Sequence, residues 1–328
     1  MIDNRTILIT GGTGNFGRAF VKYLLENYNP GKIILYSRDE HKQSILREEY
    51  SQYAHKLFFM VGDVRDGERL NEAFEGVDYV VHAAVAKHNS ACVNDLTEIA
   101  ETNIGGAECV IRAALEQKVK RVIFISTDNA VNPVNVYGET KYIAEKLFIA
   151  ANVHASKQDI LFSVVRFGNI AGSSGSVIPF FQNKIKDGAD TLPITDERIT
   201  RFWMDQKQAS RLVIAALHYS VGGEIFVAKM PSFRIIDLAE ALLPMGKTEK
   251  IGLREGERLY EVMVNVEEGL CTYEYESFYI IYPSIKWNKD QVTEPLGKKI
   301  QAGFTYSSDN NTSWLSVKEI SERIEDLT

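Results

Sequence analysis

The feature that most limits the fold of this chain is an alternation of short apolar segments with segments of helical period. Helical patterns such as GRAFVKYLLENY (17–28) and GGAECVIRAALEQKV (105–119) separate several of the apolar segments. Buried strands that alternate with helices predict an α/β fold with a doubly wound parallel sheet and helices on both faces. The expected strands are RTILIT (5–10), KIILYS (32–37), KLFFMVGDV (56–64), DYVVHAA (78–84), RVIFIST (121–127) and ILFSVVRFGN (160–169).

The alternation of expected strands and helices ends after GNIAGSSGSVIPFF (168–181). The sequence that follows has a mixed pattern, many aromatic residues and frequent glycines. Within the remainder, the strand-like GEIFVAK (223–229) is expected to return to the main sheet, together with the segment near 205–230. We predict a parallel-sheet domain over 1–168 and a smaller mixed domain over 169–328. Ligands of open α/β sheets bind outside the carboxyl ends of the strands, so the cleft is expected between the two domains.

Composition excludes several classes of protein. Hydrophobic residues make up 45% of the 328 residues and charged residues 25%, no apolar run is long enough to cross a bilayer, and MIDNRTILIT does not resemble a signal peptide. The net charge of −7 argues against binding of nucleic acid, and the six histidines show no metal-ligand spacing, so no metal is expected. Reduced thiols in a cytoplasmic protein are expected because no CxxC spacing relates Cys92, Cys109 and Cys271.

A glycine-rich loop follows the first expected strand. ILITGGTGNFGRAF (7–20) places Gly11, Gly14 and Gly17, with Asn15 and Phe16 between them, at the start of an amphipathic helix. Glycines there allow a tight turn and let backbone N–H groups approach a pyrophosphate at the positive end of the helix. The loop therefore predicts a dinucleotide cofactor. The alternative is a glycine-rich turn that binds nothing.

The end of the second strand, ILYSRDEHK (34–42), indicates which dinucleotide. NAD enzymes usually carry an acid here for the ribose 2′-hydroxyl, whereas Ser37 and Arg38 come first in this chain and suit a 2′-phosphate. Lys42 could assist, and although Asp39 weakens the assignment, NADP(H) is favoured over NAD. Further cofactor contacts are expected at the ends of the next two strands, from Asp63, Val64 and Ala83.

A tyrosine and a lysine follow the fifth strand in STDNAVNPVNVYGETKYIAEKLF (126–148). Tyr137 and Lys141 stand four residues apart and lie on one face of the expected helix. A nearby ammonium favours the phenolate, so Tyr137 could exchange a proton with a sugar hydroxyl while hydride moves to nicotinamide. Thr127 and Asp128, directly before the helix, complete the expected catalytic group.

Motifs along essentially the whole chain resemble those of the inverting UDP-N-acetylglucosamine 4,6-dehydratases, which are extended short-chain dehydrogenases/reductases of pseudaminic acid biosynthesis. The motifs are TGGTGNFG, YSRDE, GDVRD, STDxAxNPVNxYGxTK, VVRFGN, GSVIPFF, LPITD, TRFW, GGEIFVAKMPS and YSSDNNTSWL. The resemblance implies bound NADP, oxidation at C4, loss of water across C5–C6, return of hydride to C6 and protonation of C5 from the opposite face. It also implies contacts with a UDP-N-acetylhexosamine from Lys87, Asn169, Thr195, Arg254 and Glu257.

The resemblance also bears on assembly. The helix that follows Tyr137 carries the apolar stripe YIAEKLFIAA (142–151), and such helices often form oligomer contacts in this superfamily. A homo-oligomer, either a dimer or a hexamer, is therefore expected by analogy. The alternative is that the stripe packs wholly within one chain.

Asn129 is the main departure from the resembled family, which has a lysine there as the expected base for the C5 proton. An amide cannot accept that proton at neutral pH, so the dehydration step would lose its base while the redox residues remain. Loss of a general base typically lowers a rate by about 10²–10⁴. The other departures are the sequence KHNS (87–90), Glu139, Phe167, Ser174 and Tyr260.

These departures favour a divergent paralogue that reduces a 4-keto-5,6-ene UDP-sugar to the 4-keto-6-deoxy sugar inverted at C5. The alternative is a complete 5-inverting dehydratase in which another group, such as Lys87, replaces the family lysine. A UDP-sugar 4-epimerase, which needs no C5 base, and an NADP-sensing regulator without catalysis are two further alternatives. The retained tyrosine and lysine count against the regulator.

Overall fold

The computed structural model describes residues 2–87, 96–155, 158–173, 175–284 and 295–327. Its main element is a sheet with the strand order β15-β13-β14-β9-β6-β5-β4-β1-β2-β3. The strands from β9 to β3 pair in parallel, as the sequence predicted. They are β1 (Thr6–Thr10), β2 (Lys32–Ser37), β3 (Leu57–Val61), β4 (Tyr79–His82), β5 (Arg121–Thr127), β6 (Leu161–Phe167) and β9 (Ile225–Ala228).

The inner strands of the sheet are buried along almost their whole length, which explains their continuous apolar sequences. The edge strand β3 differs because Phe58 is 43% exposed. The ammonium of Lys32, on the neighbouring strand, lies 4.1 Å from the centre of the Phe58 ring. A charged side chain therefore covers part of the apolar edge, where unpaired strands risk association.

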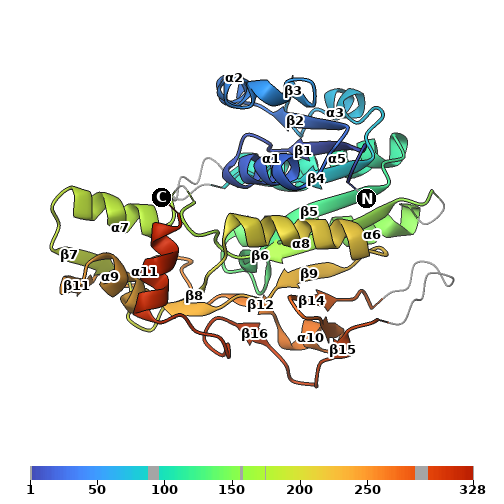
Figure 1. Ribbon diagram of the computed structural model, residues 1–328. Coiled ribbons are helices and arrows are strands. Elements are labelled where there is room, and N and C mark those ends of the chain that lie inside the picture. Colours follow the sequence, from blue (N-terminus) through green and yellow to red (C-terminus); the bar gives the residue numbers. More distant parts are fainter. Residues whose placement is uncertain (1, 88–95, 156–157, 174, 285–294, 328) are drawn as a thin grey trace.

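Helices cover both faces of the sheet, and the predicted fold class is confirmed (Figure 1). On one face α1 packs against α8, and on the other α5 packs between α3 and α6. The helices are α1 (Asn15–Asn27), α2 (Glu40–Glu49), α3 (Gly67–Ala73), α4 (Leu96–Ala100), α5 (Gly106–Glu116), α6 (Val136–Ala155) and α8 (Gln206–Tyr219), with short helices η1 (Ser51–Tyr53), η3 (Glu101–Gly105) and η4 (Asp128–Ala130).

The second half of the chain returns to the main sheet twice. Helix α8 and strand β9 do so as the sequence predicted, with β9 pairing in parallel with β6. Three further strands extend the sheet beyond β9 in antiparallel pairing, which the sequence pattern did not indicate. They are β13 (Thr272–Glu274), β14 (Phe278–Ile281) and β15 (Lys298–Lys299).

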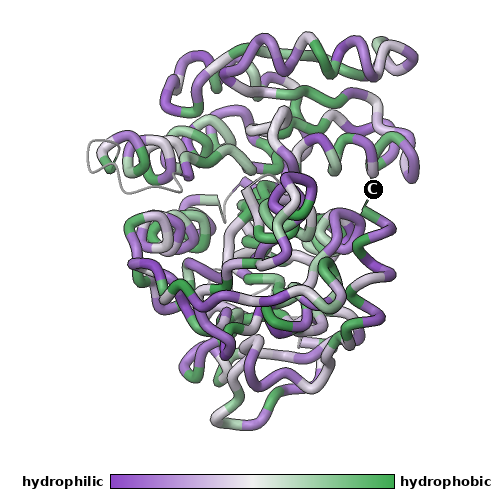
Figure 2. The backbone as a smooth tube through the Cα atoms, turned by 90° about the vertical axis from the view of Figure 1, so that its left-hand side faces the viewer, coloured by the Kyte–Doolittle hydropathy of each residue, from purple (hydrophilic) through white to green (hydrophobic). Residues whose placement is uncertain are grey.

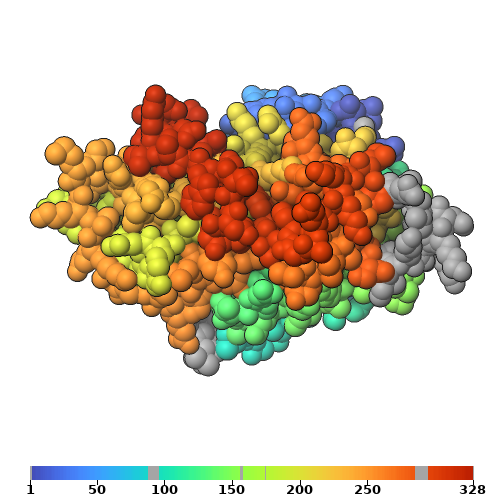
Figure 3. Space-filling view, turned by 90° about the horizontal axis from the view of Figure 1, so that it is seen from below, coloured from blue at the N-terminus to red at the C-terminus, as the bar shows by residue number. Residues whose placement is uncertain are grey.

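Several of the remaining elements gather around a second apolar core, beyond the carboxyl ends of the parallel strands (Figure 1). Figure 2 shows the hydrophobic segments gathered toward the interior of the chain. From below, segments after about residue 230 form much of one continuous surface (Figure 3). The elements at the second core are α7 (Val177–Lys186), β7 (Thr191–Ile194), β8 (Thr200–Phe202), β10 (Ser232–Arg234), α9 (Ile235–Leu242), β11 (Lys247–Lys250) and α11 (Val317–Glu325). Strands β12 (Val262–Val264) and β16 (Tyr306–Ser307), with the short helix α10 (Val266–Gly269) after β12, lie instead against the main core.

Within the described residues, every helix is too short or too polar to span a bilayer.

Candidate active site

The glycine loop joins β1 to α1 in a turn that leaves no room for a side chain at Gly11 or Gly17. Gly11 has a φ of +69°, and a Cβ added there would lie 2.7 Å from the backbone nitrogen of Ala84. A Cβ at Gly17 would lie 2.5 Å from the carbonyl oxygen of Gly11. Gly14 stands at the N-cap of α1 with no side chain capping the helix, and the first turn carries no acid. The loop therefore leaves backbone donors and the positive helix end available to an anion such as a pyrophosphate.

The other predicted cofactor residues lie at or near the same edge of the sheet. Ala83 follows β4, beside Gly11, while Phe16 on α1 packs 5.5 Å from the Phe167 ring. Strand β3 ends at Val61, so Asp63 and Val64 lie in the following loop rather than in the strand. The exposed Asn15 begins α1.

At the end of β2, several polar groups already have partners. The Ser37 hydroxyl accepts a hydrogen bond from Gln43 Nε2 at 2.9 Å. Asp39 caps α2 by accepting from the Lys42 N–H and pairs with Lys42 Nζ at 3.0 Å. Arg38 is half-exposed, 3.7 Å from Asp63 and 3.3 Å from Glu98. Lys42 is thus paired with Asp39 rather than free, whereas Arg38 keeps much of its surface available.

The predicted catalytic pair is positioned by the start of α6. The Asn135 side chain accepts from the Gly138 N–H at 2.8 Å, which places Tyr137 in the first turn. Lys141, one turn further on, is 4% exposed, and its Nζ donates to the carbonyl oxygen of Ile125 at 2.6 Å. Burial lowers the pKa of Lys141 to about 7, although the nearby Glu145 opposes this shift.

The protonation of Tyr137 differs from the sequence prediction. Burial, followed by the charge of Asp128, raises the pKa of Tyr137, and the hydrogen bond with Thr127 opposes the shift. The sequence predicted that the Lys141 ammonium would favour the phenolate. That expectation is wrong for this structure, because Lys141 is engaged with the Ile125 carbonyl and desolvation dominates.

Thr127, Asp128 and Asn129 form one hydrogen-bonded cluster where β5 ends. The Thr127 hydroxyl donates to Asp128 Oδ1 at 2.8 Å, and Asn129 Nδ2 donates to the same oxygen at 3.2 Å. Asp128 is 3% exposed. Asn129 therefore acts as a donor that holds the carboxylate, and its amide cannot act as a base.

Lys87 reaches the tyrosine from the loop after β4. Its Nζ lies 5.5 Å from the centre of the Tyr137 ring. The backbone of the preceding Ala86 is held by Asn103, whose side chain also donates to Thr140 on α6. An amine thus lies beside Tyr137 even though Asn129 is not a lysine.

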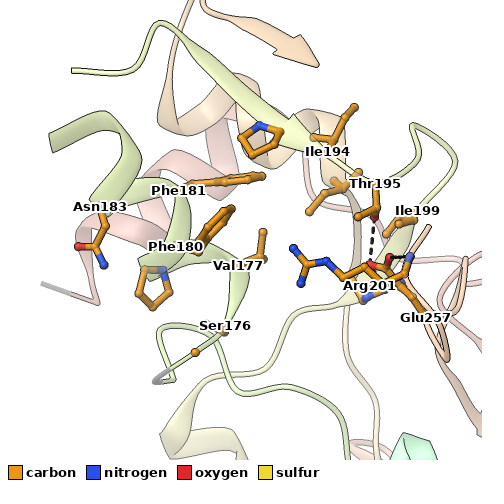
Figure 4. Close-up of a pocket in the computed structure, with 15 residues that line it drawn as sticks. Ser176, Val177, Phe180, Phe181, Asn183, Ile194, Thr195, Ile199, Arg201 and Glu257 are labelled. Carbon is orange, nitrogen blue, oxygen red and sulfur yellow. Dashed lines mark hydrogen bonds and ion pairs between the residues drawn. The ribbon is translucent and has the colours of Figure 1, made fainter. Parts of the chain in front are cut away.

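Three predicted substrate residues line a single cavity of about 420 Å³. Figure 4 shows Val177, Phe180 and Phe181 of α7 opposite Thr195, Arg201 and Glu257. Thr195 donates to Glu257 at 3.0 Å, and Arg254 completes this side of the cavity. Two arginines thus line the cavity, which gives it local positive charge in an acidic protein.

Asn169, the remaining predicted substrate residue, follows β6 and leads to a residue that the sequence did not reveal. Its Nδ2 donates to Glu261 Oε1 at 3.1 Å. Glu261 is 2% exposed, and burial, followed by the charge of Asp128, raises its pKa to about 7. Arg201 was also missed. Arg201 lies in the motif TRFW, which could have drawn attention to it, whereas no motif marks Glu261, which reaches the site through contacts with distant segments.

The other departures from the resembled family lie around this site or outside the described residues. Phe167 is buried at the end of β6, while Glu139 and Tyr260 are exposed. Positions 88–90 of KHNS and Ser174 lie outside the described residues. Among the residues described, no group of three or more histidine, cysteine or acidic side chains could hold a metal.

A family model described as Polysaccharide biosynthesis protein matches residues 7–283. The chain belongs to this family. An inverting UDP-N-acetylglucosamine 4,6-dehydratase of Campylobacter jejuni subsp. jejuni serotype O:2 is 47% identical over 99% of this chain and 98% of its own length. A UDP-glucose 4-epimerase of Rickettsia canadensis is 38% identical over 98% of this chain and 96% of its own length.

The solved structure of Pen from Bacillus thuringiensis superimposes with a TM-score of 0.88 at 36% identity, covering 99% of this chain and 98% of Pen. Similarity over nearly the full length of each relative confirms the resemblance stated from the motifs. This member of the polysaccharide biosynthesis protein family is an enzyme of the short-chain dehydrogenase/reductase type, related to the inverting 4,6-dehydratases.

Proposed function

We propose that this enzyme is a 5-inverting 4,6-dehydratase that acts on a UDP-N-acetylhexosamine with NADP as its cofactor. The observation that carries the proposal is the position of Lys87, whose Nζ lies 5.5 Å from the Tyr137 ring centre. This amine can take the role of the missing family lysine. The proposal reverses the order in which the sequence ranked dehydratase and reductase, and the 47% identity to an inverting dehydratase supports the change.

The residues present fit a dinucleotide cofactor. The loop of Gly11, Gly14 and Gly17 would hold its pyrophosphate, since Gly11 and Gly17 leave no room for a side chain and no side chain caps the α1 N-terminus. NADP is favoured because Asp39, the acid that would suit NAD, is engaged in capping α2 and pairing with Lys42. Arg38 would then bind the 2′-phosphate through charge-assisted hydrogen bonds.

The cavity between α7 and the segment around Glu257 suits a nucleoside diphosphate. Arg254 and Arg201 supply positive charge, and Thr195 and Glu257 supply polar groups that could orient the nucleoside. We therefore assign cofactor binding mainly to residues 1–168 and substrate binding mainly to residues 169–328. The exception is the segment near 205–230, which belongs with the main sheet.

Residues of this chain can then serve the oxidation at C4 and the elimination of water. Tyr137 exchanges a proton with the C4 hydroxyl, and Lys141 supports it from the same helix face. Lys87 removes the C5 proton, and the ammonium formed returns a proton to the C6 hydroxyl, which leaves as water. A proton from solvent, returned to C5 from the opposite face, inverts that centre. When bound, NADP supplies the oxidant for C4 and the reductant for C6, and its positive nicotinamide ring favours the Tyr137 phenolate.

A second candidate is the reductase of a 4-keto-5,6-ene UDP-sugar, and the observation in its favour is Asn129. The Asn129 amide is engaged with Asp128 and Thr127 and cannot act as a base. A conjugated enone accepts hydride at C6 without removal of a C5 proton, so a reductase would not need that base.

The deciding experiment incubates the purified enzyme with UDP-N-acetylglucosamine in D₂O, without added cofactor, and follows C6 and H5 by NMR. The dehydratase gives a 4-keto-6-deoxy sugar with deuterium at C5 and an inverted C5. A failure to react, followed by stoichiometric consumption of NADPH on a 4-keto-5,6-ene substrate, supports the reductase instead. Formation of the 4-epimer alone would support an epimerase and reject both readings.

Assembly into a homo-oligomer is part of the proposal. Along α6, Phe148 and Ala151 are buried, whereas Tyr142 and Ile143 are 41% and 43% exposed. The apolar stripe is therefore not wholly used within one chain. Light scattering coupled to size exclusion should give a mass of at least twice 37.0 kDa, and a monomer at micromolar concentration would reject this part.

A further inference from the structure

Asn103 is a buried polar residue that takes no direct part in the proposed reaction. It lies in η3, a single wide turn between α4 and α5 in which the Gly106 N–H donates to the Glu101 carbonyl, five residues back. Wide turns of this kind interrupt helices and are frequent at functional sites. Asn103 is 3% exposed, so its amide needs hydrogen-bond partners within the protein.

Three hydrogen bonds satisfy the Asn103 amide. Its Oδ1 accepts the Ala86 N–H at 2.9 Å, and its Nδ2 donates to the Ala86 carbonyl at 3.1 Å and to the Thr140 hydroxyl at 3.0 Å. Both hydrogens of the NH₂ group and the oxygen are therefore used. Ala86 and Thr140 are also buried, so water has little access to these bonds.

The two bonds to Ala86 fix the backbone directly before Lys87. Ala86 lies in the loop that follows β4, which ends at His82. Buried backbone groups of a loop need partners outside a strand ladder, and the Asn103 side chain supplies a donor and an acceptor together. The Ala86 carbonyl belongs to the peptide unit that it shares with Lys87. This hydrogen bond therefore sets the direction in which the chain enters Lys87.

The bond to Thr140 ties the same amide to α6. The Thr140 hydroxyl accepts from Asn103 and donates to the Tyr137 carbonyl at 2.9 Å, so two hydrogen bonds lead from Asn103 to the backbone of Tyr137. Lys87 Nζ lies 5.5 Å from the centre of the Tyr137 ring. Because Lys87 itself is exposed, packing of its side chain fixes it little, and its position depends on the anchored backbone before it.

We propose that Asn103 is a positioning residue that holds Lys87 beside Tyr137 by joining the backbone of Ala86 to Thr140. Removal of the C5 proton requires the Lys87 amine at that carbon, and a misplacement of about 1 Å can cost about 10²-fold in rate. Oxidation at C4 uses Tyr137 on α6 and does not need Lys87. Loss of Asn103 should therefore slow the removal of the C5 proton and spare the oxidation. The inference rests on the dehydratase function proposed above, in which Lys87 is the base.

Asn103→Leu tests the proposal, because it removes all three hydrogen bonds and keeps a side chain of similar size. We measure turnover of UDP-N-acetylglucosamine with hydrogen or deuterium at C5, and follow reduced nicotinamide on the enzyme by its absorbance. N103L is expected to lose about 10²-fold in kcat, to show a larger C5 isotope effect than the wild type and to accumulate NADPH. A loss of kcat with an unchanged isotope effect and no added NADPH overturns the proposal.

Two further variants separate positioning from structural damage. If Asn103 acts through Lys87, N103L should cost little further rate in an enzyme that already carries Lys87→Met, because no amine remains to be placed. Rate losses that add in the double variant overturn the proposal. Thr140→Val, which keeps the shape of threonine without its hydroxyl, is used alongside in case N103L does not fold. It should raise the isotope effect less than N103L does, and an unchanged isotope effect overturns the link to α6.

Asn152→Leu is the matched control. Asn152 is equally buried, and its amide holds both backbone groups of Phe162 in the same way, accepting the N–H at 3.1 Å and donating to the carbonyl at 2.9 Å. It lies near the end of α6 that is far from Tyr137, at the start of β6. N152L is expected to lower stability and to keep the wild-type isotope effect. If N152L also raised the isotope effect, lost stability would explain both variants and the proposal would be overturned.

Amide hydrogen exchange tests the positioning without any activity. The Ala86 N–H donates to Asn103 Oδ1, so N103L is expected to speed exchange in the segment 83–87 and to leave β6 as protected as in the wild type. Unchanged exchange in 83–87 overturns the positioning role, whatever the reaction. If the wild type does not dehydrate UDP-N-acetylglucosamine, the proposed function fails by itself, and the exchange measurement still decides whether Asn103 holds the backbone before Lys87.

Discussion

The guanidinium of Arg166 on β6 and the carboxylate of Glu145 on α6 form a fully buried ion pair, with Nη2 2.7 Å from Oε2. Glu268 of α10 supplies a second carboxylate at 2.9 Å from Nη1. Glu145 lies one helical turn beyond Lys141, so this pair anchors the catalytic helix to the sheet and to the second half of the chain. The two carboxylates, acting after the opposing effect of burial, leave the pKa of Arg166 raised.

Arg166→Met should strongly destabilise the fold, because it leaves two carboxylates buried without a counter-charge. The free energy of unfolding is expected to fall by about 3–5 kcal/mol, as measured by urea denaturation. The control is Lys318→Met, which removes one partner of the exposed Lys318–Glu322 pair and should change stability by less than about 0.5 kcal/mol. An R166M protein as stable as the wild type would contradict the anchoring role.

Lys87→Met tests whether Lys87 is the base of the proposed dehydration. If Lys87 is the C5 base, dehydration of UDP-N-acetylglucosamine should fall by about 10²–10⁴ while UDP still binds. The control is Lys22→Met, on the exposed face of α1, where the lysine pairs only weakly with Glu26 at 3.9 Å. If K87M dehydrates at the wild-type rate, Lys87 is not the base.

Arg38→Ala should change the choice of cofactor. Loss of the charge-assisted hydrogen bonds to a 2′-phosphate, at about 1.5–3 kcal/mol, corresponds to about 10- to 100-fold weaker binding of NADP. Affinity for NAD should change little, and fluorescence titration of the apoprotein with both cofactors measures the ratio. Arg69→Ala, which breaks an exposed pair with Glu72 on α3, is the control. If the affinities for NADP and NAD fell equally, Arg38 would not be the residue that distinguishes the 2′-phosphate.

Lys141→Met should separate catalysis from stability. Because burial lowers the folded pKa of Lys141 to about 7, below its ordinary value of 10.5, the stability that this group contributes is complete above pH 10.5 and is lost as pH falls through about 7. The Tm of K141M relative to wild type should therefore rise as pH is lowered from 10 to 7, while turnover is lost. A Tm difference that does not vary with pH would contradict a buried, destabilised ammonium.

The glycine loop and the shared helix face of Tyr137 and Lys141 could be predicted from sequence because their determinants are local. Gly11 follows β1 within one turn, and Tyr137 and Lys141 share one face of α6, so short spacing alone predicts their proximity. The parallel strands could also be predicted from sequence, since a strand that is buried on both faces needs a continuous apolar run.

Other parts of the molecule have no local signature. Strands β13 to β15 are two to four residues long and extend the sheet by antiparallel pairing, which so short a sequence pattern cannot specify. The state of Tyr137 was mispredicted because spacing shows that Lys141 is near, but not that the Ile125 carbonyl holds it.

The sequence by itself determined the doubly wound sheet, the glycine loop and the placing of Tyr137 and Lys141 on one helix face, because each depends on residues a few positions apart. Only the tertiary structure decided that Lys87 lies beside Tyr137 and that Glu261 lies under Asn169 with Asp128 as its neighbour. Those relationships join residues about 50 to 130 positions apart in the sequence, and they arise from how the strands and loops pack. Burial, which sets the protonation of these groups, exists only in the folded chain.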